Sequence, residues 1–229
     1  MKLVYLFFLP CIFVFFSGCD AIFHPDIKEG YILFEITYPE TDAGSLMAGI
    51  LPNEMTFRFK EDGRTVGSLT AGMGVFKTEL MAFPETKTVF QLVKLMNQKY
   101  ALKVDSSEIE SLYAELPEMK IHFVDSTKVI AEYECKMAIV TFKDNIKEEF
   151  SIFYTDDIAL HNSNWCTPFH EIKGVLLEYQ VRKYNYEMRL TATTVKPEQI
   201  DEQFFVIPED YEEIDQNGMD KIFEGFKEI

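Results

Sequence analysis

The sequence predicts a mainly β protein of the α+β class, in which one curved antiparallel sheet or open half-barrel carries a covering helix. Short apolar runs with period-two alternation recur through most of the chain and are separated by turn residues. Only two segments show helical spacing instead. The chain has 229 residues, of which 47% are hydrophobic and 14% aromatic, so it can bury a large core as one domain.

The strand pattern is clearest at residues 54–60. Met55, Phe57 and Phe59 alternate there with polar residues, as in a strand with one wet face. Asp62-Gly63 follows as a hairpin signal. By the same criteria we expect strands at residues 30–38, 54–60, 64–70, 73–82, 86–95, 99–104, 119–124, 127–134, 135–143, 148–154, 174–182 and 184–195.

Residues 106–117 predict the covering helix. Ser107 and Glu110 have the spacing of a capping box, and Pro117 would end the helix. Its apolar residues recur at helical spacing and are Ile109, Leu112, Tyr113 and Leu116.

A second helix is predicted at the C-terminus, over residues 215–229. Its apolar residues are three or four apart, which is the pattern of an amphipathic helix. We expect it to pack on the body or to fray, with partner binding as the alternative. These residues are Met219, Ile222, Phe223, Phe226 and Ile229.

The first 18 residues have the pattern of a secretory signal. Lys2 precedes an apolar run, Leu3 to Phe16, that is shorter than a membrane span. Ser17, Gly18 and Cys19 then resemble a bacterial lipobox, although an ordinary signal that happens to contain a cysteine is the alternative. The segment predicts cleavage before Cys19 and acylation of Cys19, which would make residues 19–29 a lipid anchor and tether.

The charge balance excludes one class of partner. Acidic residues outnumber Lys and Arg by 38 to 22, giving a net charge of −16. Nucleic-acid binding rests on Lys and Arg that neutralise phosphates, so a nucleic-acid partner is not expected. The same balance argues against membrane docking through overall charge.

Two cysteines remain in the predicted mature body, Cys135 and Cys166. An exported compartment permits a disulfide between them. The alternative is two separate thiols, one in a strand and one in a loop. Neither belongs to a CxxC pair, so redox or metal chemistry is not indicated.

No catalytic motif is present. The chain lacks Gly-x-Ser-x-Gly, HExxH and a phosphate-binding Gly loop. His161, Cys166 and His170 lie after Asp156 and Asp157 in a long segment, but their spacing favours a structural loop over a metal or Cys–His site. We therefore expect no enzyme activity, catalytic residue, metal or cofactor.

An apolar face is the more informative feature. Every second residue of a strand points to the same face of the sheet. The apolar residues of one such face could line the concave side of a curved sheet and bind a lipid or another apolar ligand. The alternative is a filled core capped by the helix at 106–117. The candidate ligand-facing residues are Phe57, Phe59, Val89, Ile121, Phe123, Tyr133, Phe142, Tyr154 and Tyr179.

Four segments together resemble the DUF4412 family, which is related to the GLPGLI group and typical of Bacteroidota. Their order is that of the family's Gly-Tyr-x-Cys-Lys-Lys-Ala, Trp-Tyr-Thr-x-x-Ile, Gly-x-Pro-Leu-Glu-Tyr and Phe-x-Ile-Pro-x-x-Tyr motifs. Leu176 stands where the family usually has Pro. The segments are Ala131–Ala138, Phe153–Ile158, Lys173–Tyr179 and Phe204–Tyr211.

The resemblance covers residues 30–214 and implies a half-barrel similar to the lipoprotein carriers LolA and LolB. The family has no assigned activity, so the resemblance implies no catalytic or binding residue in this chain. We therefore predict an envelope lipoprotein at the outer membrane, on either its periplasmic or its surface side, that binds an apolar ligand without catalysis. The alternative is a structural lipoprotein that docks another envelope protein and has a filled core.

Overall fold

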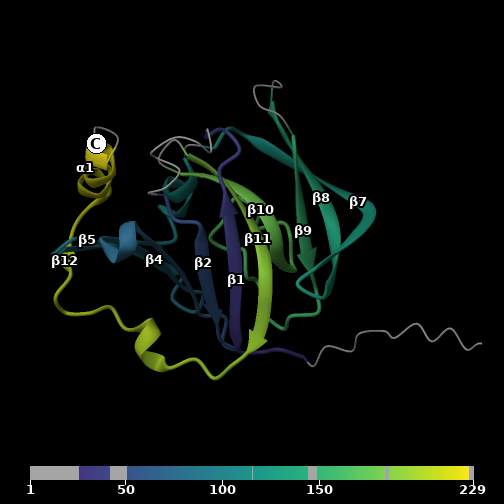
Figure 1. Ribbon diagram of the computed structural model, residues 1–229, viewed down its shortest axis with the longest axis horizontal. Coiled ribbons are helices and arrows are strands. Elements are labelled where there is room, and N and C mark those ends of the chain that lie inside the picture. Colours follow the sequence, from purple (N-terminus) through teal and green to yellow (C-terminus); the bar gives the residue numbers. More distant parts are fainter. Residues whose placement is uncertain (1–25, 42–50, 115, 144–148, 184–185, 227–229) are drawn as a thin grey trace, which may run out of the picture.

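The computed structural model describes residues 26–41, 51–114, 116–143, 149–183 and 186–226. The fold is mainly β: the described strands form one 12-stranded open sheet, and one short α-helix accompanies it (Figure 1). The strands are β1 (Gly30–Thr37), β2 (Glu54–Phe59), β3 (Thr65–Ala71), β4 (Phe76–Phe83), β5 (Thr88–Leu95), β6 (Gln98–Val104), β7 (Met119–Ile130), β8 (Tyr133–Phe142), β9 (Phe150–Thr155), β10 (Val175–Lys183), β11 (Tyr186–Pro197) and β12 (Glu212–Glu213).

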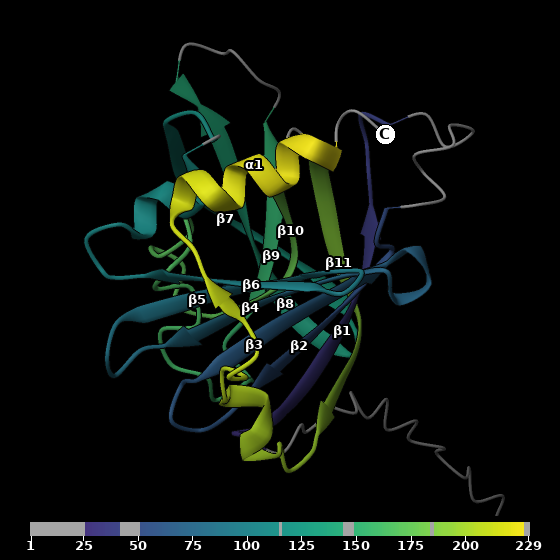
Figure 2. The same ribbon diagram turned by 90° about the vertical axis from the view of Figure 1, so that its left-hand side faces the viewer.

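The strand order is β12-β6-β5-β4-β3-β2-β1-β11-β10-β9-β8-β7. Neighbouring strands are antiparallel except β12 and β6, which are parallel. Two consecutive meanders, β1–β6 and β7–β11, therefore meet where β1 pairs with β11. The joined sheet is strongly curved, as two perpendicular views show (Figures 1 and 2). The predicted curved antiparallel sheet is confirmed.

Gly30 lies at the seam between the two meanders, opposite Pro197. A Cβ atom at this position would lie 2.2 Å from the carbonyl oxygen of Lys196. Only glycine allows the two backbones to approach this closely.

The strand register defines an inner and an outer face of the sheet. Directly paired residues point to the same side, so a row of paired positions marks one face. The inner face contains the row Ile32, Phe57, Gly67, Leu80, Gln91 and Leu102.

Two predictions about the middle of the chain were wrong. The helix expected at 106–117 is only a short 3₁₀ segment, η3 (Ile109–Tyr113), with no side-chain cap at its start. The strands expected at 119–124 and 127–134 are the single strand β7, which is irregular between Val124 and Thr127. The real turn is Ala131-Glu132, whose φ angles are +47° and +72°. Neither residue is typical of left-handed turns, so the sequence carried no turn signal there.

The predicted C-terminal helix is α1 (Gln216–Phe226). Its Met219 and Phe223 are buried, and the Phe223 ring packs edge-on against Phe76 of β4 at 5.9 Å. The prediction that this tail packs on the body is confirmed for its described part. No helix among the described residues is long and apolar enough to span a membrane.

The chain between β11 and α1 covers the outer face of β3–β6. We call residues 198–211 the outer strap. It contains the short 3₁₀ segment η5 (Glu202–Phe205). The apolar residues of the strap pack on Val66, Met81, Leu92 and Ala101, and they are Ile200, Phe204, Phe205, Ile207 and Tyr211.

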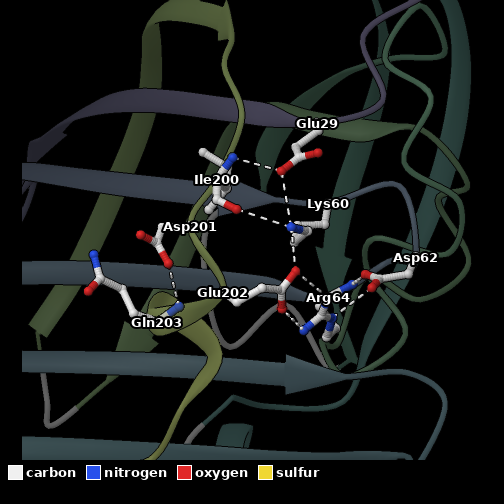
Figure 3. A network of polar contacts seen from close by, with 8 residues as sticks. All are labelled: Glu29, Lys60, Asp62, Arg64, Ile200, Asp201, Glu202 and Gln203. Carbon is white, nitrogen blue, oxygen red and sulfur yellow. Dashed lines mark hydrogen bonds and ion pairs between the residues drawn. The ribbon is translucent and has the colours of Figure 1, made fainter.

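A polar network joins the strap to the hairpin between β2 and β3 (Figure 3). Glu202 accepts hydrogen bonds from Lys60 at 2.6 Å and from Arg64 at 2.8 Å. Lys60 also donates to the carbonyl of Ile200, whose own N–H donates to Glu29 at 2.7 Å. The start of β1, the hairpin and the strap are thereby connected.

These bonds affect the ionisation of Glu202. Hydrogen bonds from Arg64 and Lys60 lower the pKa of Glu202 to about 2. A carboxylate whose pKa is lowered on folding contributes stability above its unfolded pKa, and this contribution is lost as the pH falls through the folded value. The relevant window lies between about 4.5 and about 2.

Replacing Glu202 by Gln should therefore lower the thermal unfolding midpoint slightly near pH 7. The difference from wild type should shrink as the pH falls through that window, because wild-type Glu202 becomes neutral too. Circular dichroism melts across pH measure this. Glu198→Gln, on the same strap, is the matched control and should show no such convergence. A pH-independent difference for Glu202→Gln would contradict the prediction.

Candidate functional site

The inner face is filled mainly by the long connection between β9 and β10, residues 156–172, which we call the inner loop. The loop was predicted, but its apolar residues were not recognised as core. Ile158, Leu160, Phe169 and Ile172 are all buried. Phe169 is only 1% exposed, and its ring packs edge-on against Tyr179 and Phe150, each at 6.3 Å.

Hydrogen bonds hold the inner loop in this shape. The buried Asn164 side chain donates to the carbonyls of Ile172 at 2.7 Å and Gly174 at 2.9 Å. Thr167 Oγ1 donates to the Asn164 carbonyl at 2.9 Å. The carbonyls of Gly174 and Asn164 each accept a second bond, from Ser163 Oγ at 3.3 Å and from the Thr167 N–H at 3.0 Å. The inner loop is thus an ordered part of the hydrophobic core.

A second group covers the inner face over β4–β6. Met219 and Phe223 of α1, Ile109 of η3 and Cys166 of the inner loop pack on Ala82, Val89, Val93, Leu102 and Val104. The cover predicted from one helix at 106–117 is therefore shared by three segments. Ile109 is buried there, with Leu112 packed against the same cluster.

The nine candidate ligand-facing residues fall into two groups. Phe59, Val89, Tyr133 and Phe142 are buried and belong to the core. Five residues keep part of their surface accessible, and they are Phe57, Ile121, Phe123, Tyr154 and Tyr179. The inner face is therefore neither fully hollow nor fully covered.

Tyr133 and Phe142 lie on opposite sides of β8. β8 is regular from Tyr133 to Phe142. Positions nine residues apart on a regular strand point to opposite sides. Tyr133 is buried with Cys135 on one side of β8, whereas Ala138, Val140 and Phe142 are buried on the other. Tyr133 therefore belongs to the buried cluster that includes Phe59, whereas Phe142 belongs to the cluster around Phe169.

Three of the five accessible residues lie at the β7–β9 end of the sheet. Phe123, on the edge strand β7, is 55% exposed and packs edge-on against Tyr154 of β9 at 6.2 Å. Partly buried Ile121 and Phe150 lie on the same face, next to the ring of Phe169. We call Ile121, Phe123, Phe150 and Tyr154 the aromatic strip.

A separate hollow lies elsewhere in the described part of the chain. It has a volume of about 670 Å³ and is formed between β6, the approach to η3 and the start of α1. Its lining includes none of the candidate residues, and seven of its ten lining residues are polar or charged. The lining residues are Leu102, Lys103, Val104, Ser107, Glu108, Ser111, Glu213, Ile214, Asp215 and Gln216.

Sequence reasoning missed one buried charged group. Glu178 of β10 is 1% exposed and accepts hydrogen bonds from Lys128, at 2.7 Å, and from Arg189. Burial alone would raise its pKa, but the two cations outweigh burial and leave the pKa of Glu178 below its usual value. Lys128 also lies 4.9 Å from the centre of the Phe153 ring. This cluster ties the β7–β8 hairpin to β10 and β11. In the sequence, the only indication of this cluster is that Glu178 stands within an apolar strand segment.

The other polar candidates remain apart. His161 and His170 are exposed on the inner loop, away from the buried Cys166 side chain. Among the described residues no group of three or more His, Cys, Asp or Glu is placed to hold a metal ion. Cys19 and the signal segment lie outside the described residues.

The possible disulfide is not formed. Cys135 and Cys166 are both buried free thiols. They belong to different apolar clusters. Cys135 lies on β8, and Cys166 of the inner loop packs against β4–β6. The alternative of one strand thiol and one loop thiol is the arrangement present.

Comparison with known proteins shows no family. No family model matches the chain, and no curated protein matches it, so the DUF4412 resemblance remains a prediction from motifs. Among solved structures, the crystal structure of LprF from Mycobacterium bovis is similar, with 13% identity over 80% of this chain and 90% of that chain. Its TM-score is 0.28, a likeness too low to support a functional conclusion.

Replacing Phe169 by Ala should destabilise the protein by about 3–5 kcal/mol, because it leaves a cavity at the centre of the inner face. The control is Phe123→Ala, which removes an exposed ring and should cost less than about 1 kcal/mol. Urea unfolding of both variants measures the difference. Equal effects would show that the inner loop is not part of the core.

Both body thiols should be unreactive in the native protein at pH 8. Burial raises the pKa of Cys135 and of Cys166 to about 12, so neither forms a thiolate at that pH. A colorimetric thiol reagent should detect both only after denaturation, without any reductant. Detection of neither thiol under those conditions would indicate a bridge.

Proposed function

We propose that this protein is a lipid-anchored envelope protein that binds a lipid or another apolar molecule along the aromatic strip. The observation that carries the proposal is the exposure of Phe123 beside Tyr154 and Ile121. The inner loop covers other parts of the same face but leaves these side chains accessible. Exposed apolar surface at the margin of a core is typical of a binding surface.

The chemistry of the strip suits an acyl chain. Aromatic rings and a branched aliphatic side chain offer dispersion contacts and no ionic partner for a ligand. Lys136 of β8, opposite Tyr154 in register, lies at the end of the strip and pairs with Asp156 at 2.6 Å. A polar headgroup would meet this pair while the chain lies over Phe123 and Ile121. Binding of this kind needs no catalytic residue or cofactor.

The anchor completes the proposal. Acylation of Cys19 would attach the protein to the envelope, at the outer membrane, through residues 19–29. Of this tether the structure describes residues 26–29, where Ile27 forms a parallel bridge with Ile158 of the inner loop. The inner loop therefore holds the predicted tether at the end where it joins β1.

An interaction protein is the second candidate, and the filled inner face favours it. β7 is a 12-residue strand at the sheet edge, and most of its side chains are exposed. An edge strand can pair with a strand of another protein. The irregularity between Val124 and Thr127 interrupts that edge and makes a long pairing less favourable.

Phe123→Ser combined with Tyr154→Ser should reduce apolar ligand binding at least tenfold, because it removes the exposed rings. The measurements are native mass spectrometry of protein purified from its own envelope and titration with a fluorescent fatty acid. Val206→Ser is the control, since Val206 is 60% exposed on the outer strap and should leave binding unchanged. No ligand in the native protein and no binding in titration would reject the proposal. A stable protein partner recovered from the envelope would then support the second candidate.

A further inference from the structure

The ends of the hairpins β3–β4 and β5–β6 form a second apolar surface, remote from the aromatic strip. Val75 is 46% exposed and Met96 is 68% exposed. The two tips lie side by side, because the N–H of Met96 donates to the carbonyl of Val75 at 2.7 Å. Partly buried Phe76 and Leu95 are paired directly behind them. We call residues 71–78 and 92–101 the paired tips.

Met96 has an unfavourable backbone for its residue type. Its φ is +53°, in the left-handed region where Gly and Asn are preferred. Its side chain is exposed, so burial does not offset that cost. A strained, exposed apolar residue at a turn is a feature that points to function.

The charge of the paired tips differs from that of the whole chain. These two segments contain Lys77, Lys94 and Lys99 and no acidic residue, whereas acids predominate in the complete sequence. The three lysines form a continuous cross-strand row, since Lys94 pairs in register with both Lys77 and Lys99. Lys77 and Lys99 also form ion pairs with Glu79 and Asp210, which moderates the positive charge.

We propose that the paired tips contact a lipid bilayer. Val75 and Met96 would enter the interfacial region, and the lysine row directly behind them would meet the phosphates of anionic lipids. Apolar residues bordered by lysines are the combination that binds a membrane interface. The net charge of the protein does not prevent this, because charges more than about 10 Å away are largely screened by salt.

The geometry lets the paired tips and the proposed anchor reach the same bilayer. The tips lie at the far end of β3–β6 from Gly30, where the tether enters. Because Ile27 is held by its bridge to Ile158, the extensible part of the tether is the eight residues from Cys19 to Asp26, which reach about 26–29 Å, and an eight-residue strand spans about 26 Å. The protein would then be attached to the bilayer at two points, the acylated Cys19 and the paired tips. It rests on the proposed envelope location and not on ligand binding by the aromatic strip.

The test uses the full-length protein, purified with its native modification and reconstituted into vesicles. Met96→Cys carries an environment-sensitive nitrobenzoxadiazole label, and Val206→Cys carries the same label as the control. The wild-type protein serves as the labelling blank, since Cys135 and Cys166 are buried. The vesicles contain phosphatidylcholine alone or equal parts of phosphatidylcholine and phosphatidylglycerol, each with and without brominated acyl chains.

The label at Met96 should shift to shorter wavelength and be quenched by brominated lipid, whereas the label at Val206 should behave as in water. Val75→Ser should reduce the quenching at Met96 at least twofold. Lys94→Glu should reduce it in the phosphatidylglycerol vesicles only, and Lys87→Glu, on the β4–β5 turn, should have no effect.

A Met96 label as exposed to water as the Val206 label in both vesicle types would overturn the proposal. Quenching that is insensitive to Lys94→Glu would overturn the role of the lysine row alone. Mass spectrometry of the same sample reports acylation of Cys19 separately, and fatty-acid titration reports the aromatic strip. An absence of Cys19 acylation or of ligand binding at the aromatic strip can therefore be distinguished from an absence of membrane contact at the paired tips.

Discussion

The structure depends on the packing of the inner loop inside a curved sheet. Twelve strands with apolar residues on both sides cannot remain open to water, so each face requires a cover. Phe169 and Ile172 fill the inner face where β8–β10 curve, while Met219 and Phe223 of α1 cover it over β4–β6. The outer strap covers the opposite face of β3–β6. Segments without regular structure thus supply much of the core.

The unequal cover of the inner face determines where binding can occur. The inner loop buries Phe59 and Phe142 but leaves Phe123 and Tyr154 accessible beside the edge strand β7. The opposite edge differs, because β12 pairs with β6 and the N–H of Ile214 donates to Ala101. Besides Leu80 and Val206, the exposed large apolar side chains of the described residues lie on the edge strand β7 and at the paired tips. These are the two places to which we assign contacts with lipid.

Charged groups have a different part in this fold. The buried Glu178 is neutralised by Lys128 and Arg189, and the three residues come from strands that are not all neighbours. A buried carboxylate is tolerated only with such partners, and losing one of them would leave an uncompensated charge. The cluster joins the β7–β8 hairpin to β10 and β11. The exposed network at Glu202 has the same effect on the outer strap, more weakly.

The sequence alone determined most of the strand positions and the amphipathic tail, because period-two alternation and helical spacing are local properties of the chain. The same local information predicted a signal segment, the acylation of Cys19 and an apolar face. Only the tertiary structure decided what fills that face. Burial of Phe169, the reversal of sides along β8, the separation of Cys135 from Cys166 and the pairing of Val75 with Met96 depend on contacts between distant segments. No periodicity records such contacts, since they arise only when the sheet curves.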